Sequence, residues 1–482
     1  MGKMLHNLVL LFLFVPILTF AGPRNDFEQT DLDKYVHQPD SAFSFSIVRI
    51  DETKDYRAIL VELVSQSYLN SDDVDRTFWK HSLKLVVPRL VQHDTAMLMI
   101  GGGDNNNQAI SPPTDLAIQF SVTTNSVVAE LGMVPNQPLT FAADSEPRWE
   151  DALIAYTWDK FFKTGDSRWP ARMAMTKSAT AAMTAIQRLL AEEDVTIKDF
   201  FVAGASKRGW TTWTTAAVDD RVRAIAPIVI DLLNIEPSFE HHWRVYGFWS
   251  PAIQDYVDMS TTDWWRSAES HALFDLVAPL SYRDRYTMPK LILNAAGDEF
   301  FVPTSSQFYY DKLPDEKYLR YVPNVGHGID DSDALETVLA FYASILNQVT
   351  LPNIDWVMRD DGAIEVTADV PPKGVSVWSA SNKSARDFRL PVIGKSWVQT
   401  QASKLSETRF RGNVSDPDDG WRAYFVEVVF DTPFGIPFKL TSPVRVTPDR
   451  LPFEYIPPKK PKGGFLSQSE ENSSNGKTLP VR

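Results

Sequence analysis

The chain has no cysteine among its 482 residues. Thiol nucleophiles, cysteine-bound metals and disulfides are therefore excluded, and any core must be stable without covalent cross-links. The chain also lacks an excess of positive charge, because its formal net charge is −14 at pH 7. Such a protein repels phosphate backbones and anionic lipid, so we expect neither a nucleic acid nor a membrane surface as its partner.

Long apolar runs are also scarce, and the clearest one, at residues 8–20, lies near the N-terminus. A lysine precedes this run, and small residues around Ala21 resemble a signal-peptidase cleavage site. Its thirteen residues would reach only about 20 Å as a helix, against about 30 Å for a membrane core, and Pro16 interrupts them. We therefore predict a signal peptide over residues 1–21, a mature chain from about Gly22, secretion, and no membrane insertion after cleavage.

The rest of the chain alternates short apolar runs with amphipathic segments, and its 44% hydrophobic content is enough for a large core. This alternation predicts a mostly parallel sheet with helices on both faces. An antiparallel pair is expected first, at residues 43–50 and 56–64. Further strands are expected at 83–87, 96–100, 126–131, 200–203, 224–230, 291–295 and 318–322, and helices at 149–162, 172–191, 207–218, 305–313 and 331–347.

Three segments depart from this alternation. Residues 231–288 separate two predicted strands and are rich in aromatic residues and histidine, so we expect a helical cap over the site. Residues 351–457 predict a small β-sandwich-like domain, and the tail 458–482 is too polar to form a core and is expected to be disordered. The sandwich strands are expected at 364–368, 375–379, 421–430 and 438–446.

Ser206 has the sequence setting of a catalytic nucleophile. It lies in Gly204-Ala205-Ser206-Lys207-Arg208-Gly209, between a predicted strand and a predicted helix. A serine hydroxyl needs a base that takes its proton, and a tight strand-to-helix turn lifts it out of the sheet. The usual pattern has a glycine two residues after the serine, whereas this chain has Arg208 there and a glycine one residue later. On the motif alone, a structural serine in a glycine-containing turn is the alternative.

Two downstream residues strengthen the interpretation. Asp298 follows the buried run at 291–295, and His327 follows the strand at 318–322 in a Pro-Asn-Val-Gly-His-Gly loop. Serine, aspartate and histidine in this chain order are typical of the α/β-hydrolase triad, with each member on a loop at the same sheet edge. Glu299 is the alternative acid. The predicted fold class is therefore α/β, an α/β-hydrolase domain over residues 22–350 with the cap insertion and the C-terminal β-rich domain.

An oxyanion hole is expected at the glycines that follow the strand at 96–100. Gly102 and Gly103 leave backbone amides accessible to a bound carbonyl, and the Lys207 amide would be the second donor. A phosphate-binding loop is the competing interpretation, but the Lys-Ser/Thr ending is missing and Asp104 follows the glycines.

Three further residues are candidates for substrate binding. Arg208 could bind an acidic substrate group or form a salt bridge within the acidic protein, and His241 and His242 lie in the predicted cap. Adjacent histidines diverge and make a poor metal pair, so packing or substrate lining is expected of them. No cofactor or metal motif is found, and none is predicted. Three Asn-x-Ser sequons predict a glycoprotein, with glycans at Asn382, Asn413 and Asn472.

Several motifs of this chain are long and rarely occur together. They are residues 204–210, Gly101-Gly102-Gly103-Asp104-Asn105, Val134-Pro135-Asn136-Gln137-Pro138, Trp169-Pro170 with Met175-Thr176-Lys177, Gly297-Asp298-Glu299-Phe300-Phe301 and residues 323–328. Together they resemble the PhoPQ-activated pathogenicity-related protein family over roughly residues 42–448. The resemblance implies an exported α/β-hydrolase-like fold with a Ser-Asp-His site and an unsettled substrate. A secreted autocrine proliferation repressor of social amoebae is also similar.

Two hypotheses follow from these observations. The first is a secreted serine hydrolase that cleaves an ester or amide of a small molecule or peptide through an acyl-enzyme, with Ser206, Asp298 and His327 as its triad. The second is a secreted autocrine signal on the same fold that acts through a cell-surface receptor. Fold alone does not distinguish catalysis from signalling.

Overall fold

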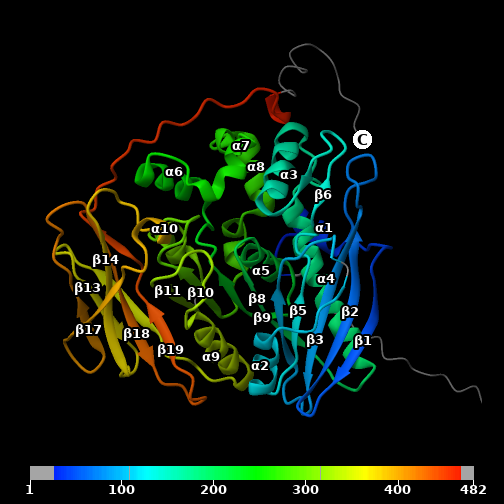
Figure 1. Ribbon diagram of the computed structural model, residues 1–482, viewed down its shortest axis with the longest axis horizontal. Helices are drawn as coiled ribbons and strands as arrows, with labels where there is room; N and C mark the ends of the chain where they lie inside the picture. The colour runs from blue at the N-terminus through cyan, green and yellow to red at the C-terminus, as the bar shows by residue number, and fades with distance from the viewer. Residues whose placement is uncertain (1–25, 108, 315, 468–482) are drawn as a thin grey trace, which may run out of the picture.

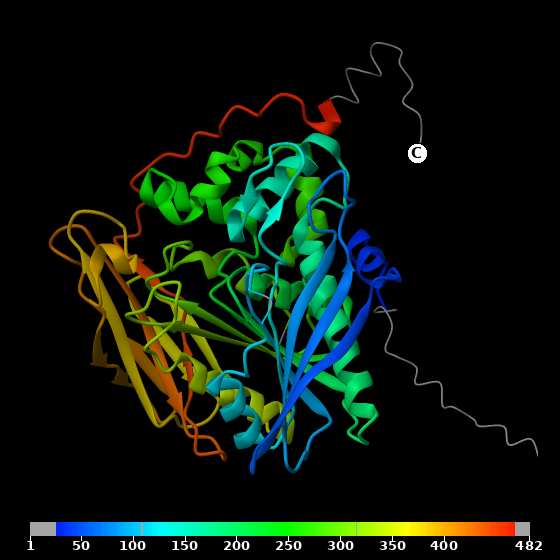
Figure 2. The ribbon, with the colours of Figure 1, turned by 45° about the vertical axis from the view of Figure 1, so that its right-hand side comes forward.

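The computed structural model describes residues 26–107, 109–314 and 316–467, and the predicted signal peptide lies outside this part of the chain. A nine-stranded sheet runs through the molecule in the order β1-β2-β3-β5-β4-β8-β9-β10-β11 (Figures 1 and 2). Strands β1, β2, β3 and β5 pair antiparallel, and the pairs from β5 to β11 are parallel. The bounds are β1 Ser44–Glu52, β2 Tyr56–Ser67, β3 Phe78–Pro88, β4 Thr95–Ile100, β5 Val128–Leu131, β8 Asp199–Ala205, β9 Val222–Ile228, β10 Lys290–Ala295 and β11 Lys317–Val322.

Both faces of the sheet are covered, as the continuous apolar runs in its central strands predict. Side chains alternate along a strand, so Leu98 and Val202 join one hydrophobic cluster while Met97 and Phe201 join the other. Helices α1, α4 and α5 pack on the first face, and α2 and α9 on the second. These helices are α1 Asp31–His37, α2 Asp115–Thr124, α4 Ala171–Ala191, α5 Lys207–Val218 and α9 Ala334–Asn347. The predicted α/β class is confirmed, and the topology is that of an α/β-hydrolase.

One predicted helix, at 305–313, is wrong. Two short 3-10 turns replace it, η4 Ser305–Phe308 and η5 Tyr310–Lys312. The Ser305 hydroxyl donates to the carbonyl of Val302 at 2.7 Å, and such local side-chain bonds compete with helix formation.

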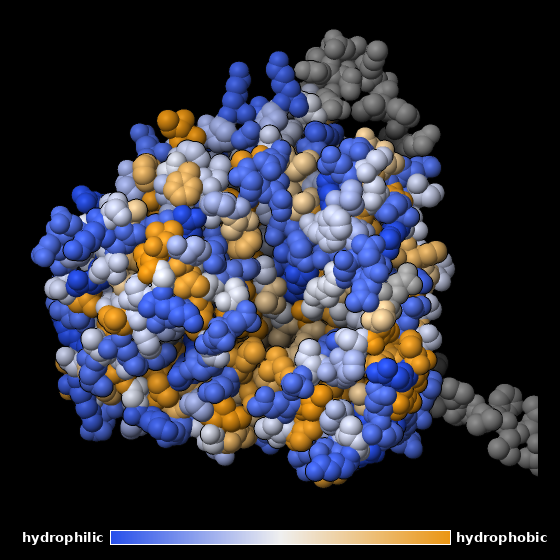
Figure 3. All heavy atoms as spheres, in the orientation of Figure 1, coloured by the Kyte–Doolittle hydropathy of each residue, from blue (hydrophilic) through white to orange (hydrophobic). Residues whose placement is uncertain are grey.

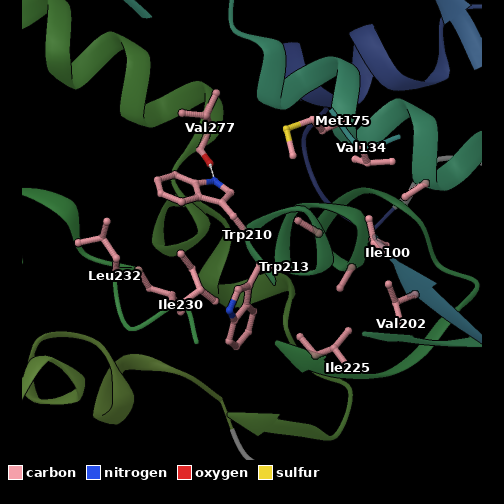
Figure 4. Close-up of a cluster of buried hydrophobic side chains, with 14 of the residues drawn as sticks. Ile100, Val134, Met175, Val202, Trp210, Trp213, Ile225, Ile230, Leu232 and Val277 are labelled. Carbon is pink, nitrogen blue, oxygen red and sulfur yellow. Dashed lines mark hydrogen bonds between the residues drawn. The ribbon is translucent and has the colours of Figure 1, made fainter. Parts of the chain in front are cut away.

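The insertion between β9 and β10 is helical, and we call it the cap, although its role over a site stays a prediction. Together with α3, it lies above the sheet edge where the parallel strands end (Figure 1). The indole N–H of Trp210 on α5 donates to the carbonyl of Val277 at 2.6 Å and so ties the insertion to α5 (Figure 4). The elements are α3 Glu150–Thr164, α6 Ile235–Tyr246, η1 Pro251–Ile253, α7 Gln254–Asp258, η2 Thr261–Trp264, α8 Ala268–Val277 and η3 Pro279–Arg285, with a hairpin of β6 Leu139–Thr140 and β7 Pro147–Arg148.

The C-terminal part forms two further antiparallel sheets, which β19 joins to β11 and α9 of the first domain. The predicted strand at 438–446 is interrupted and forms β19 and β20. One sheet contains β12 Ile354–Met358, β13 Ile364–Ala368, β16 Ser403–Lys404 and β17 Arg409–Gly412, and the other contains β14 Gly374–Asn382, β15 Val398–Gln401, β18 Trp421–Phe430, β19 Phe438–Thr441 and β20 Arg445–Thr447, with the short α10 Leu390–Ile393 between β14 and β15.

Residues 449–467 return across the top of the cap, and we call them the strap (Figures 1 and 2). Its last part was expected to be disordered, but Phe465 packs against Phe161 of α3 with ring centroids 5.6 Å apart. Lys460 forms an ion pair with Glu269 of α8 at 2.8 Å. Residues 468–482, including the sequon at Asn472, lie outside the described part of the chain.

On the face seen in Figure 3, hydrophilic residues predominate and hydrophobic ones form separate groups among them. Among the described residues, no helix combines the length and apolar character needed to cross a membrane.

Candidate active site

Ser206 occupies a strained turn between β8 and α5. Its backbone has φ 57° and ψ −126°, an unfavourable conformation for a residue with a side chain. Two hydrogen bonds hold it there: its amide donates to the Ile228 carbonyl at 2.8 Å, and its carbonyl accepts from the Trp210 amide at 3.0 Å. This is the backbone arrangement of a nucleophile elbow.

The two glycines of the motif allow this turn to form. A Cβ on Gly204 would lie 2.7 Å from the Arg208 carbonyl oxygen, and one on Gly209 would lie 2.9 Å from the Gly204 carbonyl oxygen. Both positions therefore require glycine where α5 crosses β8. This explains why the glycine lies three residues after Ser206 instead of two. Gly209 is the residue at the close approach of helix and strand, so position 208 can carry a long side chain.

Asp298 and His327 come together at the same sheet edge, after β10 and β11. The Nδ1 atom of His327 lies 3.0 and 2.9 Å from the two carboxylate oxygens of Asp298. The amides of Phe300 and Phe301 donate to Asp298 Oδ1 at 2.7 and 3.3 Å. With Nδ1 held by the carboxylate, the imidazole presents Nε2 as the nitrogen that can accept a proton.

The Nε2 atom of His327 is buried and has no hydrogen-bond partner among the described residues, so the Ser206 hydroxyl is not bonded to it in this structure. The Phe300 and Phe301 rings lie 4.3 and 5.9 Å from the imidazole centroid. Both phenylalanines also line a small cavity at Ser206. Serine and histidine therefore border the same aromatic pair.

Glu299, the alternative acid, contacts the histidine loop rather than the ring. Its Oε2 accepts the backbone amide of His327 at 2.6 Å. A Cβ on Gly326 would lie 2.5 Å from Glu299 Oε1, so the glycine leaves room for this carboxylate. Of the two acids, Asp298 is the one at the imidazole.

The predicted oxyanion loop follows β4, the neighbour of β8. The carbonyls of Gly101 and Gly102 accept from Val134 and Met133 at 3.1 and 2.8 Å, which fixes the loop. Within the described chain, the amides of Gly102 and Gly103 donate to no protein group. Lys207 begins α5, and the first amides of a helix have no intrahelical acceptor. The three predicted donors therefore have amides available to a ligand.

Arg208 holds the oxyanion loop. Its Nη1 and Nη2 atoms donate to Glu150 at 2.8 and 2.6 Å, and its Nε donates to the Val134 carbonyl at 2.6 Å. A Cβ on Gly102 would lie 2.6 Å from Arg208 Nη2, so the guanidinium rests directly on the loop. Gln137 donates to the Gly103 carbonyl at 3.0 Å and to Glu150 at 2.6 Å. The guanidinium therefore has protein partners, and substrate binding by Arg208 remains a prediction.

The Lys207 side chain belongs to the same charged cluster. Its Nζ lies 2.8 Å from Glu150 and 3.0 Å from Asp151. Burial would raise the pKa of Glu150, but the Arg208 and Lys207 cations outweigh this effect and lower its pKa to about 2. Glu150 is therefore ionised throughout the ordinary pH range.

The two cap histidines are internal hydrogen-bonding residues. His241 Nε2 lies 2.8 Å from Thr304 Oγ1, and His242 Nε2 accepts the Ser250 amide at 3.0 Å. Burial lowers the pKa of each to about 3, which keeps both rings neutral. Neither lines the cavity at Ser206, so a substrate role for them also remains a prediction.

That cavity has a volume of about 30 Å³. The sequence motifs did not indicate the other walls of this cavity. Those walls come from α3, α4, the cap and the loops after β9 and β10, and an apolar residue outside a motif cannot be distinguished in the sequence from a core residue. Arg172 near the start of α4 is the main site residue that was missed, and only its position at the beginning of a predicted helix could have drawn attention to it. These other walls include Asp151, Trp158, Arg172, Ile230, Leu232, Phe239, Ile253 and Tyr256, and Trp210 of the motif 204–210 also lines the cavity.

A larger cavity of about 400 Å³ lies beside the oxyanion loop and is lined in part by Asn105, Met133 and Asn136. None of Ser206, Asp298 and His327 lines it, so we do not assign the chemistry to it. In the described part of the chain, no group of three or more His, Asp or Glu side chains is arranged to hold a metal ion.

The fold and the elbow define a protein of the α/β-hydrolase class. Residues 32–389 match the model of the PhoPQ-activated pathogenicity-related protein family, and the chain belongs to that family. It is also 33% identical, over 92% of its length and 94% of the relative, to autocrine proliferation repressor protein A of Dictyostelium discoideum.

Among solved structures, similar folds occur in two acetyl xylan esterases, each with 14% sequence identity to this chain. That from a Thermoanaerobacterium species has a TM-score of 0.46 and aligns over 65% of this chain and 93% of its own. That from a Paenibacillus species has a TM-score of 0.45 and aligns over 66% and 95%.

Proposed function

We propose that the protein is a secreted serine hydrolase that cleaves an ester or amide bond of a small molecule or peptide through an acyl-enzyme. Ser206 is the nucleophile, His327 the general base and acid, and Asp298 the residue that orients the imidazole and stabilises its charged form. The amides of Lys207 and of Gly102 or Gly103 bind the oxyanion.

The reaction proceeds in two halves. His327 Nε2 takes the Ser206 proton while Oγ attacks the substrate carbonyl, and it returns the proton to the leaving alcohol or amine as the tetrahedral intermediate collapses. Water then attacks the acyl-enzyme with His327 again as base, which releases the acid and restores the serine. In both halves the oxyanion forms between β4 and the start of α5.

The observation that carries this proposal is the environment of the two ends of the His327 ring. Asp298 binds Nδ1 at 2.9 Å, while Nε2 is buried and has no partner in the described chain. A buried ring nitrogen without a hydrogen bond is costly. Acceptance of the Ser206 proton supplies that partner, since catalytic hydrogen bonds often tighten only when substrate is bound.

Hydrolysis of p-nitrophenyl acetate by the purified mature chain tests the proposal, with Ser206→Ala and His327→Ala as variants. Each replacement is expected to lower kcat by about a millionfold if the three side chains act as in serine proteases. Ser406→Ala, at an exposed serine outside the site, is the control and should leave turnover unchanged. Equal turnover by wild type and Ser206→Ala would refute the proposal.

A second candidate is a secreted signal that acts through a cell-surface receptor. The name of the Dictyostelium relative, an autocrine proliferation repressor, favours it. The Ser206→Ala protein in a proliferation assay separates the two functions: a retained cellular response supports signalling without catalysis, whereas a lost response with normal folding supports the hydrolase.

A further inference from the structure

Arg172 lies beside the nucleophile and is almost completely buried, with 4% of its surface exposed. It lines the same cavity as Ser206, and its Nη1 donates to the Lys207 carbonyl at 3.4 Å. Its guanidinium carbon lies 3.8 Å from the Trp210 ring centroid and 5.7 Å from that of Trp158. The cation therefore lies over the Trp210 ring, with Trp158 further away, at the wall of the cavity.

Arg172 differs from the two cations beside it in the kind of partner it has. Lys207 and Arg208 are paired with Glu150 and Asp151, two cations with two carboxylates. In the described chain Arg172 forms no ion pair, and its buried Nε has no hydrogen-bond partner. Burial lowers the pKa of this guanidinium from its ordinary value, and the neighbouring Tyr256 and Asp151 offset only part of that effect.

Among the described residues that line the cavity, Asp151 is the one acidic residue, and both of its oxygens are engaged. Oδ2 lies 3.0 Å from Lys207 Nζ, and Oδ1 accepts the Tyr256 hydroxyl at 2.9 Å. The rest of the wall is mainly aromatic and aliphatic. The interaction of a cation with aromatic faces offsets only part of the free energy that its removal from water costs. Asp255 is a further carboxylate near Asp151 and Lys207, but in the described chain none of these carboxylates forms a direct ion pair with Arg172.

We propose that Arg172 is a specificity residue that binds a carboxylate of the substrate, so that the enzyme acts on a short acyl group that ends in a carboxylate. A planar carboxylate matches the guanidinium geometry. The cavity of about 30 Å³ has room for little more than one water molecule, so its walls must move to admit a ligand and only a short acyl chain is expected. The assignment rests on the proposed function, because the acyl carbonyl must lie at Ser206 for its far end to reach Arg172.

The competing role for Arg172 is general stabilisation of the oxyanion by its positive charge. That role makes no distinction between neutral and carboxylate-bearing ligands in the ground state. Binding to a variant without the nucleophile therefore separates the two roles, and it does so without requiring turnover.

The test is calorimetric titration of the Ser206→Ala protein with malonamate and succinamate, which carry one carboxylate and one amide carbonyl, and with their neutral diamides. At least one carboxylate is expected to bind about tenfold or more tightly than its diamide. Arg172→Met should abolish this preference and Arg172→Lys should retain part of it. Arg188→Met, about 24 Å further along the same helix, is the control and should keep it.

Equal affinity for carboxylate and diamide in the Ser206→Ala protein overturns the proposal, whether or not Arg172→Met folds. An unchanged preference in a folded Arg172→Met protein also overturns it. Neither result bears on hydrolysis, which the p-nitrophenyl acetate assay measures separately with a neutral substrate.

Discussion

Both terminal nitrogens of the Arg208 guanidinium donate to the Glu150 carboxylate, at 2.8 and 2.6 Å. The pair joins the start of α5 to the start of α3. Gln137 donates to both Glu150 and the Gly103 carbonyl, so it links this salt bridge to the loop on the other side of the proposed oxyanion hole. Arg208 stands where the usual elbow has a glycine.

Replacement of Arg208 by lysine should lower kcat for p-nitrophenyl acetate by about 10- to 100-fold, with a smaller effect on KM. Lysine cannot bind Glu150 with two nitrogens and also reach the Val134 carbonyl, so the loop amides are held less firmly at the oxyanion. Arg168→Lys, which breaks a similar pair with Asp166 on the surface, is the matched control. An equal effect of both replacements would contradict this positioning role.

Glu150 should give the protein a specific acid sensitivity. Its pKa is about 2 in the folded protein, below the ordinary 4.5, so its contribution to stability is fully present above pH 4.5 and is lost as the pH falls toward 2. The difference in Tm between wild type and Glu150→Gln should therefore be constant above pH 5 and shrink below it. A difference that is independent of pH down to 2.5 would contradict the assigned ion pairs.

His242 should contribute over a different pH range. Its pKa is about 3 when folded and near 6.5 when unfolded, so below pH 6.5 the unfolded chain takes up a proton that the folded chain does not. Stability is thus lost from pH 6.5 to 3, at up to about 1.4 kcal/mol per pH unit. Denaturant titrations should show a shallower pH dependence for His242→Gln, and an identical slope would show that the ring is not buried in its neutral form.

The strap should stabilise the cap through Lys460. Glu269 is fully buried by the strap, so Lys460→Met leaves a buried carboxylate without its cation and should cost about 2 kcal/mol. Glu269→Gln added to Lys460→Met should recover part of this loss, because the uncompensated charge is removed. Urea unfolding of the wild type, Lys460→Met and the double variant measures these differences in stability. A double variant less stable than Lys460→Met would show that the uncompensated charge of Glu269 is not the cause of the loss.

Local patterns in the sequence were sufficient to predict the strands of the main sheet and most of the helices of the α/β domain. The run 200–203, the glycines at 204 and 209 and the helix 207–218 act within one short segment, so the turn at Ser206 could be predicted. The pairing of Asp298 with the His327 ring followed from chain order, since parallel strands place their ends at one edge.

Other features depend on contacts between distant segments. Glu150 and Arg208 are 58 residues apart, and nothing near either residue marks the other as its partner. The strap has the composition of a disordered tail, yet Phe465 fits against Gly165 and Phe161, which lie 300 residues earlier in the sequence. The segment 305–313 has helical spacing, but the Ser305 hydroxyl bonds to the local backbone instead.

The most direct test of the central claim is mass spectrometry of the mature chain after reaction with a fluorophosphonate. The account predicts one modified residue, Ser206, in the folded protein, and loss of the label in His327→Ala and after denaturation before labelling. A folded wild-type protein that stays unlabelled at Ser206, or that reacts equally when His327 is replaced, would contradict it.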